Sequence, residues 1–450
     1  MSQSTESPGA EPTPLPGLPS GSSDPCVHCG FCLPTCASYR VLGTEMDSPR
    51  GRIHTLKAIE AGELELDATV ASHFDSCLGC FACVSACPSG VRYDQLIEAT
   101  RPKLNQPELR SSWQSSFRQL LLQVLPYPKR LRALLTPLRA YAGTPLQQLA
   151  RRSGLLKLLG PQLGAMEALL PPLAPEGFAD RFAPVNPAHG TARGRVGLVL
   201  GCVQRCFDPE VNAATVAVLQ ANGFEVVIPP NQGCCGAVSH HQGQLEQTQE
   251  LASALVESFA GERLDAVLVA ASGCGHTMKS YGELLGEGHS GFAIPVLDVH
   301  EFLASRGLSD TFLASLEPLR HTDGSNASKE RPVAVAYHDA CHMIHGQGIR
   351  AQPRQLLQAI PHLQLREATE AGVCCGSAGI YNLVQPDEAA ALGTIKANDL
   401  TNTGAAVVAS ANIGCTLQLR RHLHDDGPSV AHPMQLLAAS AGLLETSCFS

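Results

Sequence analysis

Several features that would assign this chain to a common class of protein are missing from its sequence. No stretch approaches 18 uninterrupted apolar residues, so we expect no transmembrane helix. No Gly-x-Gly-x-x-Gly follows a strand pattern, and there is no P-loop or nucleophile motif. We therefore expect neither a flavin site nor hydride chemistry on this chain. Helix-turn-helix punctuation is also missing, which argues against nucleic-acid binding.

We do not expect an export signal in the first 25 residues. These residues contain no Lys or Arg and no apolar run, and they are rich in Pro, Ser, Gly and Thr. We interpret residues 1–23 as a disordered tail. Eighteen cysteines in a chain of 450 residues without a signal peptide indicate a reducing, cytoplasmic location. Any membrane contact is expected to be peripheral, at the inner face.

What the sequence does have is two runs of four cysteines, which begin at Cys26 and Cys77. Both have the spacing C-x2-C-x2-C-x3-C, and a proline follows the second run, as in bacterial ferredoxins. In such two-cluster proteins three cysteines of a run bind one [4Fe–4S] cluster and the fourth binds the other. The predicted ligands are Cys26, Cys29, Cys32 and Cys87 for cluster 1, and Cys77, Cys80, Cys83 and Cys36 for cluster 2.

Zinc sites and disulfides are the alternatives for these cysteines. Zinc sites pair C-x2-C units across longer gaps, and neither zinc nor disulfides require four cysteines at this spacing twice. We therefore expect residues 24–100 to form a helical ferredoxin-type domain with two [4Fe–4S] clusters that moves electrons.

A basic segment follows this domain. Residues 101–160 contain eleven Lys and Arg but a single acidic residue, Glu108, although the whole chain has a net charge of −9. Apolar helical stretches occur at 117–125 and 131–138. Basic amphipathic helices suit an anionic lipid surface or an acidic partner; the other interpretation is a solvated linker whose charges balance acidic neighbours. We expect residues 101–190 to form a basic helical connecting segment.

An α/β unit then occurs twice. Strand patterns at 196–200, 224–228 and 265–270 alternate with helical patterns at 212–223 and 245–262, which indicates a parallel sheet. Similar strand patterns return at 333–337 and 405–409, and equivalent cysteines are separated by nearly constant offsets. The prediction is a multidomain protein with two duplicated domains of α/β class, at 191–310 and 330–445, joined by a linker at 322–329.

Each repeat contains four cysteines, two of them adjacent. They are Cys202, Cys234, Cys235 and Cys274 in the first repeat, and Cys341, Cys374, Cys375 and Cys415 in the second. Adjacent thiolates suit a metal or a redox reaction. A further iron–sulfur cluster, one cluster shared by the repeats, redox thiols and inert buried cysteines are all open. Cys206 has no equivalent cysteine in the second repeat, where His345 occupies the corresponding position. His345 is either a substitute ligand or a surface residue. Cys448 is interpreted as a spare thiol.

Together these motifs resemble the iron–sulfur subunits of flavin-linked 2-hydroxyacid oxidoreductases, and among them the glycolate oxidase family. The resemblance covers residues 24–440. It depends on Cys26–Cys32, Ser48–Ile53, Cys77–Arg92, Tyr337–Gly346, Cys374–Gly379 and Ala411–Cys415.

The resemblance implies an electron-transfer subunit of a glycolate oxidase (glycolate dehydrogenase) complex. FAD on partner subunits would oxidise glycolate to glyoxylate, and this chain would pass the electrons to a quinone or another acceptor that is neither NAD nor oxygen. The chain would be inactive alone. The corresponding subunit of a D-lactate or glycerol-3-phosphate dehydrogenase is an alternative, and an iron–sulfur redox sensor or a zinc-bound scaffold are alternatives of other classes.

Two further features concern the clusters. The cysteine-rich motif of heterodisulfide reductase ends in C-x2-C, but this chain has Thr277 and Gln418 at the final positions, which argues against a disulfide-cleaving cluster. Arg50 and Arg52 lie between the two cysteine runs and are expected to place hydrogen bonds or positive charge near a cluster and raise its potential. Alternatively, they cap a helix or pair with Glu45 and Asp47.

Overall fold

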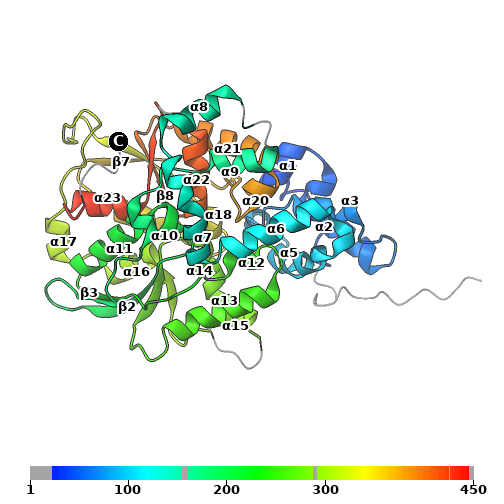
Figure 1. Cartoon of the computed structure of the whole chain (residues 1–450), viewed down its shortest axis with the longest axis horizontal. Coiled ribbons are helices and arrows are strands. Elements are labelled where there is room, and N and C mark those ends of the chain that lie inside the picture. Colours follow the sequence, from blue (N-terminus) through cyan, green and yellow to red (C-terminus); the bar gives the residue numbers. More distant parts are fainter. Residues whose placement is uncertain (1–22, 155, 157–159, 287–290, 425, 445–450) are drawn as a thin grey trace, which may run out of the picture.

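A computed structural model describes residues 23–154, 156, 160–286, 291–424 and 426–444. Helices of the N-terminal part gather at one end of the molecule, and the two β-sheets lie toward the other end (Figure 1). The predicted tail, apart from Ser23, and the spare thiol Cys448 lie outside the described residues.

The N-terminal part consists of short helices around the cysteine loops. Ser48 and Asp67 each accept a hydrogen bond from a backbone N–H of the helix that follows, and thereby cap its N-terminus. Apolar side chains such as Ile53, Phe74 and Ile97 are buried between the helices. The helices are α1 (Ala37–Leu42), α2 (Pro49–Glu60), α3 (Ala68–Asp75), α4 (Ala82–Ser85) and α5 (Tyr93–Thr100), with 3-10 turns at Glu45–Asp47, Arg101–Asn105 and Pro107–Leu109.

The connecting segment consists of helices joined by short loops. The apolar stretches at 117–125 and 131–138 lie mainly in α6 (Ser112–Val124) and α7 (Pro128–Leu135), and α8 (Pro145–Ser153) and α9 (Pro161–Ala168) follow. The last three of these helices begin with a proline, whose fixed φ suits the first helical position. None of the described helices has both the length and the hydropathy needed to cross a bilayer.

The first repeat contains a five-stranded sheet in the order β1-β3-β2-β4-β5. All neighbouring strands are parallel except the short β1, which is antiparallel to β3. The strands are β1 (Val185–Asn186), β2 (Gly194–Val199), β3 (Phe224–Val227), β4 (Ala266–Val269) and β5 (Val296–Asp298). The helices are α10 (Gln204–Phe207), α11 (Pro209–Ala221), α12 (Ala237–His240), α13 (Leu245–Ser258), α14 (Ser272–Lys279), α15 (Tyr281–Leu284), α16 (Val299–Arg306) and α17 (Asp310–Ala314).

The second repeat has an all-parallel sheet in the equivalent order, β7-β6-β8-β9. Its strands are β6 (Val333–His338), β7 (Leu363–Arg366), β8 (Val407–Ser410) and β9 (Ser429–Ala431). The helices are α18 (Cys341–Ile344), α19 (Ala351–Leu357), α20 (Tyr381–Val384), α21 (Pro386–Thr401), α22 (Ile413–His422) and α23 (Pro433–Ser440). The predicted duplication is thus present in the topology of the two sheets.

The two repeats share one hydrophobic core. Residues of both sheets, such as Val196, Leu268, Val335 and Ala409, belong to the same buried cluster. Helix α11, between β2 and β3, packs against α23, which follows β9, and α19, between β6 and β7, packs against α16, which follows β5. This reciprocal packing relates the repeats by an approximate two-fold and fixes the positions of their cysteines.

Candidate metal centres

The eight ferredoxin-type cysteines line two neighbouring cavities. Those predicted for cluster 1 line one cavity, and those predicted for cluster 2 line the other. Cys83 borders both cavities, so the two are adjacent. The fold therefore brings each predicted set together, with the fourth cysteine of each run, Cys36 or Cys87, beside the other run. Cluster binding by these particular residues remains a prediction.

Left-handed residues turn the cysteine loops. Gly79 has a φ of +64° and Phe81, on the other side of Cys80, a φ of +61°. A Cβ atom on Gly79 would lie 2.8 Å from Nη2 of Arg101, so a side chain here would force the Arg101 guanidinium to shift. Glycine at this position therefore allows the loop to turn and Arg101 to approach it.

Two buried arginines lie beside the cluster 2 cavity. Arg101 donates a hydrogen bond from Nη2 to the carbonyl oxygen of Cys77 at 3.0 Å, and Arg52 lines the cavity itself. Burial alone would raise the pKa of the Cys77 thiol, but the positive charges of Arg52 and Arg101 outweigh it and lower that pKa. Burial raises the pKa of Cys80 and Cys83 well above the usual range. Cys77 is thus more readily deprotonated for metal binding than Cys80 or Cys83.

The donors of these arginines fit an anionic group. In the described part of the chain, Nη1 of Arg52 and Nη1 of Arg101 are both buried without a hydrogen-bond partner. Buried guanidinium N–H groups are normally paired, because an unpaired one costs desolvation free energy. A cluster with thiolate ligands would supply negative charge and sulfur acceptors next to them.

The predicted tuning residues Arg50 and Arg52 have different surroundings. Arg50 is partly exposed, pairs with Glu45 (Nε–Oε1 2.6 Å), and lines the cluster 1 cavity. Arg52 is 1% exposed and donates from Nη2 to Ser76 Oγ at 2.8 Å. Its guanidinium lies 3.7 Å from Asp47. Both arginines therefore make the predicted carboxylate contacts and also line a cavity; their effect on potential stays a prediction.

The cysteines of each repeat form a row of sulfur contacts. In the first repeat Cys202 and Cys234 are 3.3 Å apart, and Cys235 contacts Cys234 and Cys274. The contact with Cys234, together with burial, raises the pKa of Cys202 well above the usual range. A metal would therefore have to displace thiol protons to bind here.

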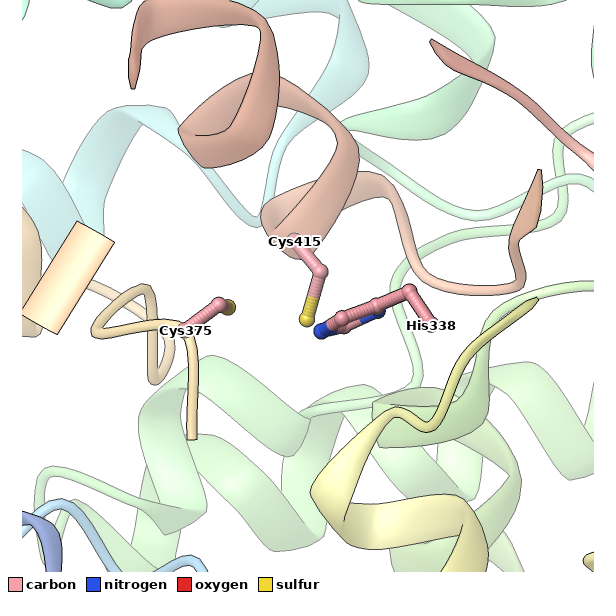
Figure 2. A group of neighbouring side chains, drawn as sticks. All are labelled: His338, Cys375 and Cys415. Atoms are coloured by element: carbon pink, nitrogen blue, oxygen red, sulfur yellow. The ribbon is translucent and has the colours of Figure 1, made fainter. Parts of the chain in front are cut away.

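The second repeat has an equivalent row and an additional histidine. Cys341 and Cys374 are 3.9 Å apart, and Cys375 contacts Cys374 and Cys415. His338 joins Cys375 and Cys415 in a buried group whose ligand atoms all lie within 4.8 Å of one another (Figure 2). Burial, aided by the charge of Lys396, lowers the pKa of His338 to about 3, so its imidazole is neutral, as a metal ligand must be.

The cluster 2 loop is in contact with the second repeat. Cys80 packs beside Cys341 and Cys374 in one small apolar cluster. His342 lies 3.0 Å, through Nε2, from the carbonyl oxygen of Gly79, and the rings of Phe81 and His342 are 5.2 Å apart. The second repeat therefore forms part of the wall next to the cluster 2 cavity, together with His276 of the first repeat, whose ring lies 5.4 Å from that of Phe81.

Cys206 and His345, which the sequence analysis also considered, lie outside the cysteine groups of the two repeats. Cys206 is 1% exposed and packs with Leu131 and Leu135 of the connecting segment. His345 lies 2.8 Å from the hydroxyl of Ser85 through Nδ1 and contacts the carbonyl oxygen of Gly372. It links the second repeat to the N-terminal helices.

Sequence reasoning missed the site roles of Arg101 and His338. The sequence indicates for Arg101 only that it belongs to the basic segment, because no local pattern marks a residue 24 positions after Cys77 as a neighbour of Cys77. His338 could have been found, because the repeat offset aligns it with an apolar residue, Val199, in the first repeat.

Comparison with known families matches most of the chain. Residues 22–91 match a model described as 4Fe-4S dicluster domain, and residues 196–279 and 335–420 both match the model cysteine-rich domain. Residues 113–170 match the linker region of the glycolate oxidase iron-sulfur subunit. These matches confirm the predicted order of a dicluster domain followed by two cysteine-rich domains, and [4Fe–4S] clusters as cofactors.

Similar proteins extend over nearly the full length. A probable glycolate oxidase iron-sulfur subunit of Bacillus subtilis is 33% identical over 93% of this chain and 94% of its own. The glycolate oxidase iron-sulfur subunit of Escherichia coli is 32% identical, covering 92% of each chain. A lactate utilization protein A of Exiguobacterium is 25% identical over 54% of this chain and 94% of its own. With its dicluster domain, specific linker and paired cysteine-rich domains, the chain belongs to the family of glycolate oxidase iron–sulfur subunits.

Proposed function

We propose that this chain passes electrons from FAD on partner subunits, where glycolate is oxidised to glyoxylate, to a quinone or another acceptor that is neither NAD nor oxygen. The observation that supports this best is the pair of adjacent cysteine-lined cavities, which share Cys83. Two adjacent one-electron carriers can take the two electrons of a reduced flavin one at a time. The chain is inactive alone, because the substrate is oxidised on another polypeptide.

Cluster 1 is the proposed entry point. Its cavity is lined by Cys29, which is exposed, and by Val27 and Phe31, whose exposed fractions are 69% and 66%. Apolar side chains of this exposure favour burial against a partner. A flavoprotein seated here would bring its cofactor close to Cys26, Cys29, Cys32 and Cys87.

Cluster 2 is the proposed second carrier, on Cys77, Cys80, Cys83 and Cys36. Arg52 and Arg101 place two positive charges beside it, which favours the reduced, more negative state and raises its potential. Arg50 acts more weakly on cluster 1, because it is partly exposed to solvent and forms a short ion pair with Glu45. The reduction potential would therefore rise from cluster 1 to cluster 2, which draws electrons inward.

Peripheral contact with the inner face of the cytoplasmic membrane is proposed for residues 101–160. The charge of this segment supports it less than the sequence implied, because Arg110 and Arg118 pair with Asp75 and Arg151 pairs with Glu167. Exposed leucines support it more, and they are Leu120, Leu134, Leu146 and Leu149. Co-sedimentation with anionic vesicles tests this proposal, with Leu146→Ser and Leu149→Ser together expected to weaken binding.

The proposed domain limits remain 24–100, 101–190, 191–310 and 330–445. The shared core of the two repeats supports treating the last two as one folding unit. D-lactate and glycerol 3-phosphate are the competing substrates, and the partial similarity to a lactate utilization protein supports the first.

The relay is tested in the assembled complex with Cys29→Ala. Glycolate should still reduce the flavin, while glycolate-dependent quinone reduction falls at least tenfold. Cys206→Ala is the matched control, since this thiol lies in the connecting segment's core and should leave the rate unchanged. Normal quinone reduction by the Cys29→Ala complex would rule out the relay.

A further inference from the structure

One strand position distinguishes the two repeats. In the first repeat, the register of β2 and β4 pairs Val199 with Val269. In the second, the register of β6 and β8 pairs His338 with Ser410. The offset is 139 residues between Val199 and His338 and 141 between Val269 and Ser410, and the cysteines that follow the ends of these strands have the same offsets. The two pairs are therefore structurally equivalent, and only the second is polar.

The polar pair is fully inside the protein. His338 is 2% exposed and Ser410 is 0% exposed. A buried imidazole destabilises the fold unless its nitrogens are satisfied, so an apolar pair such as that of the first repeat would be the more stable choice. Ser410 Oγ lies 3.3 Å from Nδ1 of His338, which leaves Nε2 for another partner. Figure 2 shows an imidazole nitrogen facing the sulfur of Cys415.

The spacing of these ligand atoms suits a single ion. A tetrahedral ion with zinc-like bond lengths holds its nitrogen and sulfur ligands ~3.6–3.8 Å apart. The group of His338, Cys375 and Cys415, within 4.8 Å, reaches that spacing with small side-chain rotations. Cubane ligands bind different irons and point apart, and the ferredoxin-type cysteines form no comparably close trio in the described residues.

The surroundings supply the interactions that thiolate ligands need. Asn412 donates a hydrogen bond from Nδ2 to Cys415 Sγ at 3.4 Å. Lys396, 1% exposed, places a positive charge near Cys374 and Cys375. Cys374 contacts Cys375 and is the nearest further thiol for a fourth position. Hydrogen bonds and charges that act on the ligands, rather than on the ion, orient these ligands and stabilise their negative charge.

We propose that the second repeat binds one zinc-class ion through His338, Cys375 and Cys415, and that the first repeat lacks this site. The ion replaces the two thiol protons, which pass to solvent, and no electron is transferred. It joins the ends of β6 and β8 to the Cys374–Cys375 loop, which packs beside Cys80. The ion thus fixes the wall next to cluster 2, a role that the electron relay itself does not require.

The test is the metal content of the anaerobically purified full chain. The wild type should contain about one zinc per chain besides its cluster iron. The double variant His338→Val, Ser410→Val reproduces the apolar pair of the first repeat and should fold; it should lose most of the zinc and keep its iron and cubane EPR signals. Cys415→Ser should do the same, whereas Cys274→Ser, its counterpart in the first repeat, should keep the zinc.

An independent measurement does not depend on any variant. Zinc X-ray absorption of the wild type should show nitrogen together with sulfur in the first coordination shell. Wild-type protein without zinc, zinc retained by the double variant, or a shell of sulfur alone would each overturn the proposal. Loss of iron and acid-labile sulfide in Cys415→Ser would overturn it too, since the repeat would then hold an iron–sulfur cluster.

Discussion

Arg101 donates a hydrogen bond from Nη2 to the backbone carbonyl oxygen of Cys77, at a distance of 3.0 Å. The residue lies at the start of the connecting segment but belongs structurally to the cluster 2 loop. Its second terminal nitrogen, Nη1, is buried without a partner in the described part of the chain. A positive charge thus acts on the Cys77 thiol, and an unpaired donor lies beside Gly79 of the same loop.

Replacing Arg101 with Met should lower the reduction potential of cluster 2. A unit charge acting over ~7–14 Å at an effective dielectric near 20 corresponds to about 50–100 mV. EPR-monitored redox titration measures the change. Arg92→Gln is the control, because Arg92 is largely exposed and pairs with Asp94 at the surface. Equal potentials in wild type and Arg101→Met would show that the arginine is only a packing residue.

Gly79 and Gly90 allow the loss of stability caused by an added side chain to be compared between a crowded and an open position. Both have positive φ, +64° and +67°, but a Cβ on Gly90 meets nothing within 4 Å, whereas one on Gly79 meets Arg101. Gly90→Ala should cost about 1 kcal/mol of stability from backbone strain alone. Gly79→Ala should cost more and should also reduce the cluster 2 EPR signal. Thermal unfolding and iron analysis distinguish the two, and identical behaviour would contradict the close packing.

The fourth cysteine of each run is assigned to the cluster of the other run, so its replacement should remove that other cluster. Cys87→Ser lies in the second run but should remove cluster 1, whose cavity it lines. Cys36→Ser lies in the first run but should remove cluster 2. The cluster that remains is identified by EPR after reduction, using Cys29→Ala and Cys80→Ala as references. If each serine variant lost the cluster of its own run, the assignment would be wrong.

Stability should decrease as the pH falls below about 6.5, in part through His342. Burial, with the neighbouring His276, lowers the pKa of His342 to about 3. Its folded pKa is below the unfolded value, so the unfolded chain binds the proton first. The contribution of neutral His342 to the free energy of unfolding is complete above the unfolded pKa. It is lost as the pH falls towards 3, by at most about 1.4 kcal/mol per pH unit.

His342→Gln should therefore make the loss of stability between pH 7 and 5 less steep. Thermal unfolding at a series of pH values measures the slope, with His189→Gln, at an exposed position, as the control. A His342→Gln slope as steep as that of the wild type would mean that other groups control the acid sensitivity.

Much of this architecture was predictable because local spacing encodes it. The two cysteine runs and the constant offsets between repeats identified the dicluster domain, the duplication and the parallel sheets. Strand β7 was not predicted, because Leu363–Arg366 alternates between half-buried and exposed residues instead of forming an apolar run. The contact of Cys80 with Cys341 joins residues far apart in sequence and could not be read from either motif. The same holds for Arg52, whose complete burial depends on Ser38, Asp47 and Ser76 meeting around it.

The most direct test of the relay is freeze-quench EPR on the anaerobic complex of this chain with its flavoprotein subunits. After glycolate is added, both cubane signals should appear, and adding a quinone should remove them at the rate of steady-state turnover. Glyoxylate formation and quinone reduction at full rate while both clusters stay oxidised would contradict the account, because the electrons would then bypass this chain.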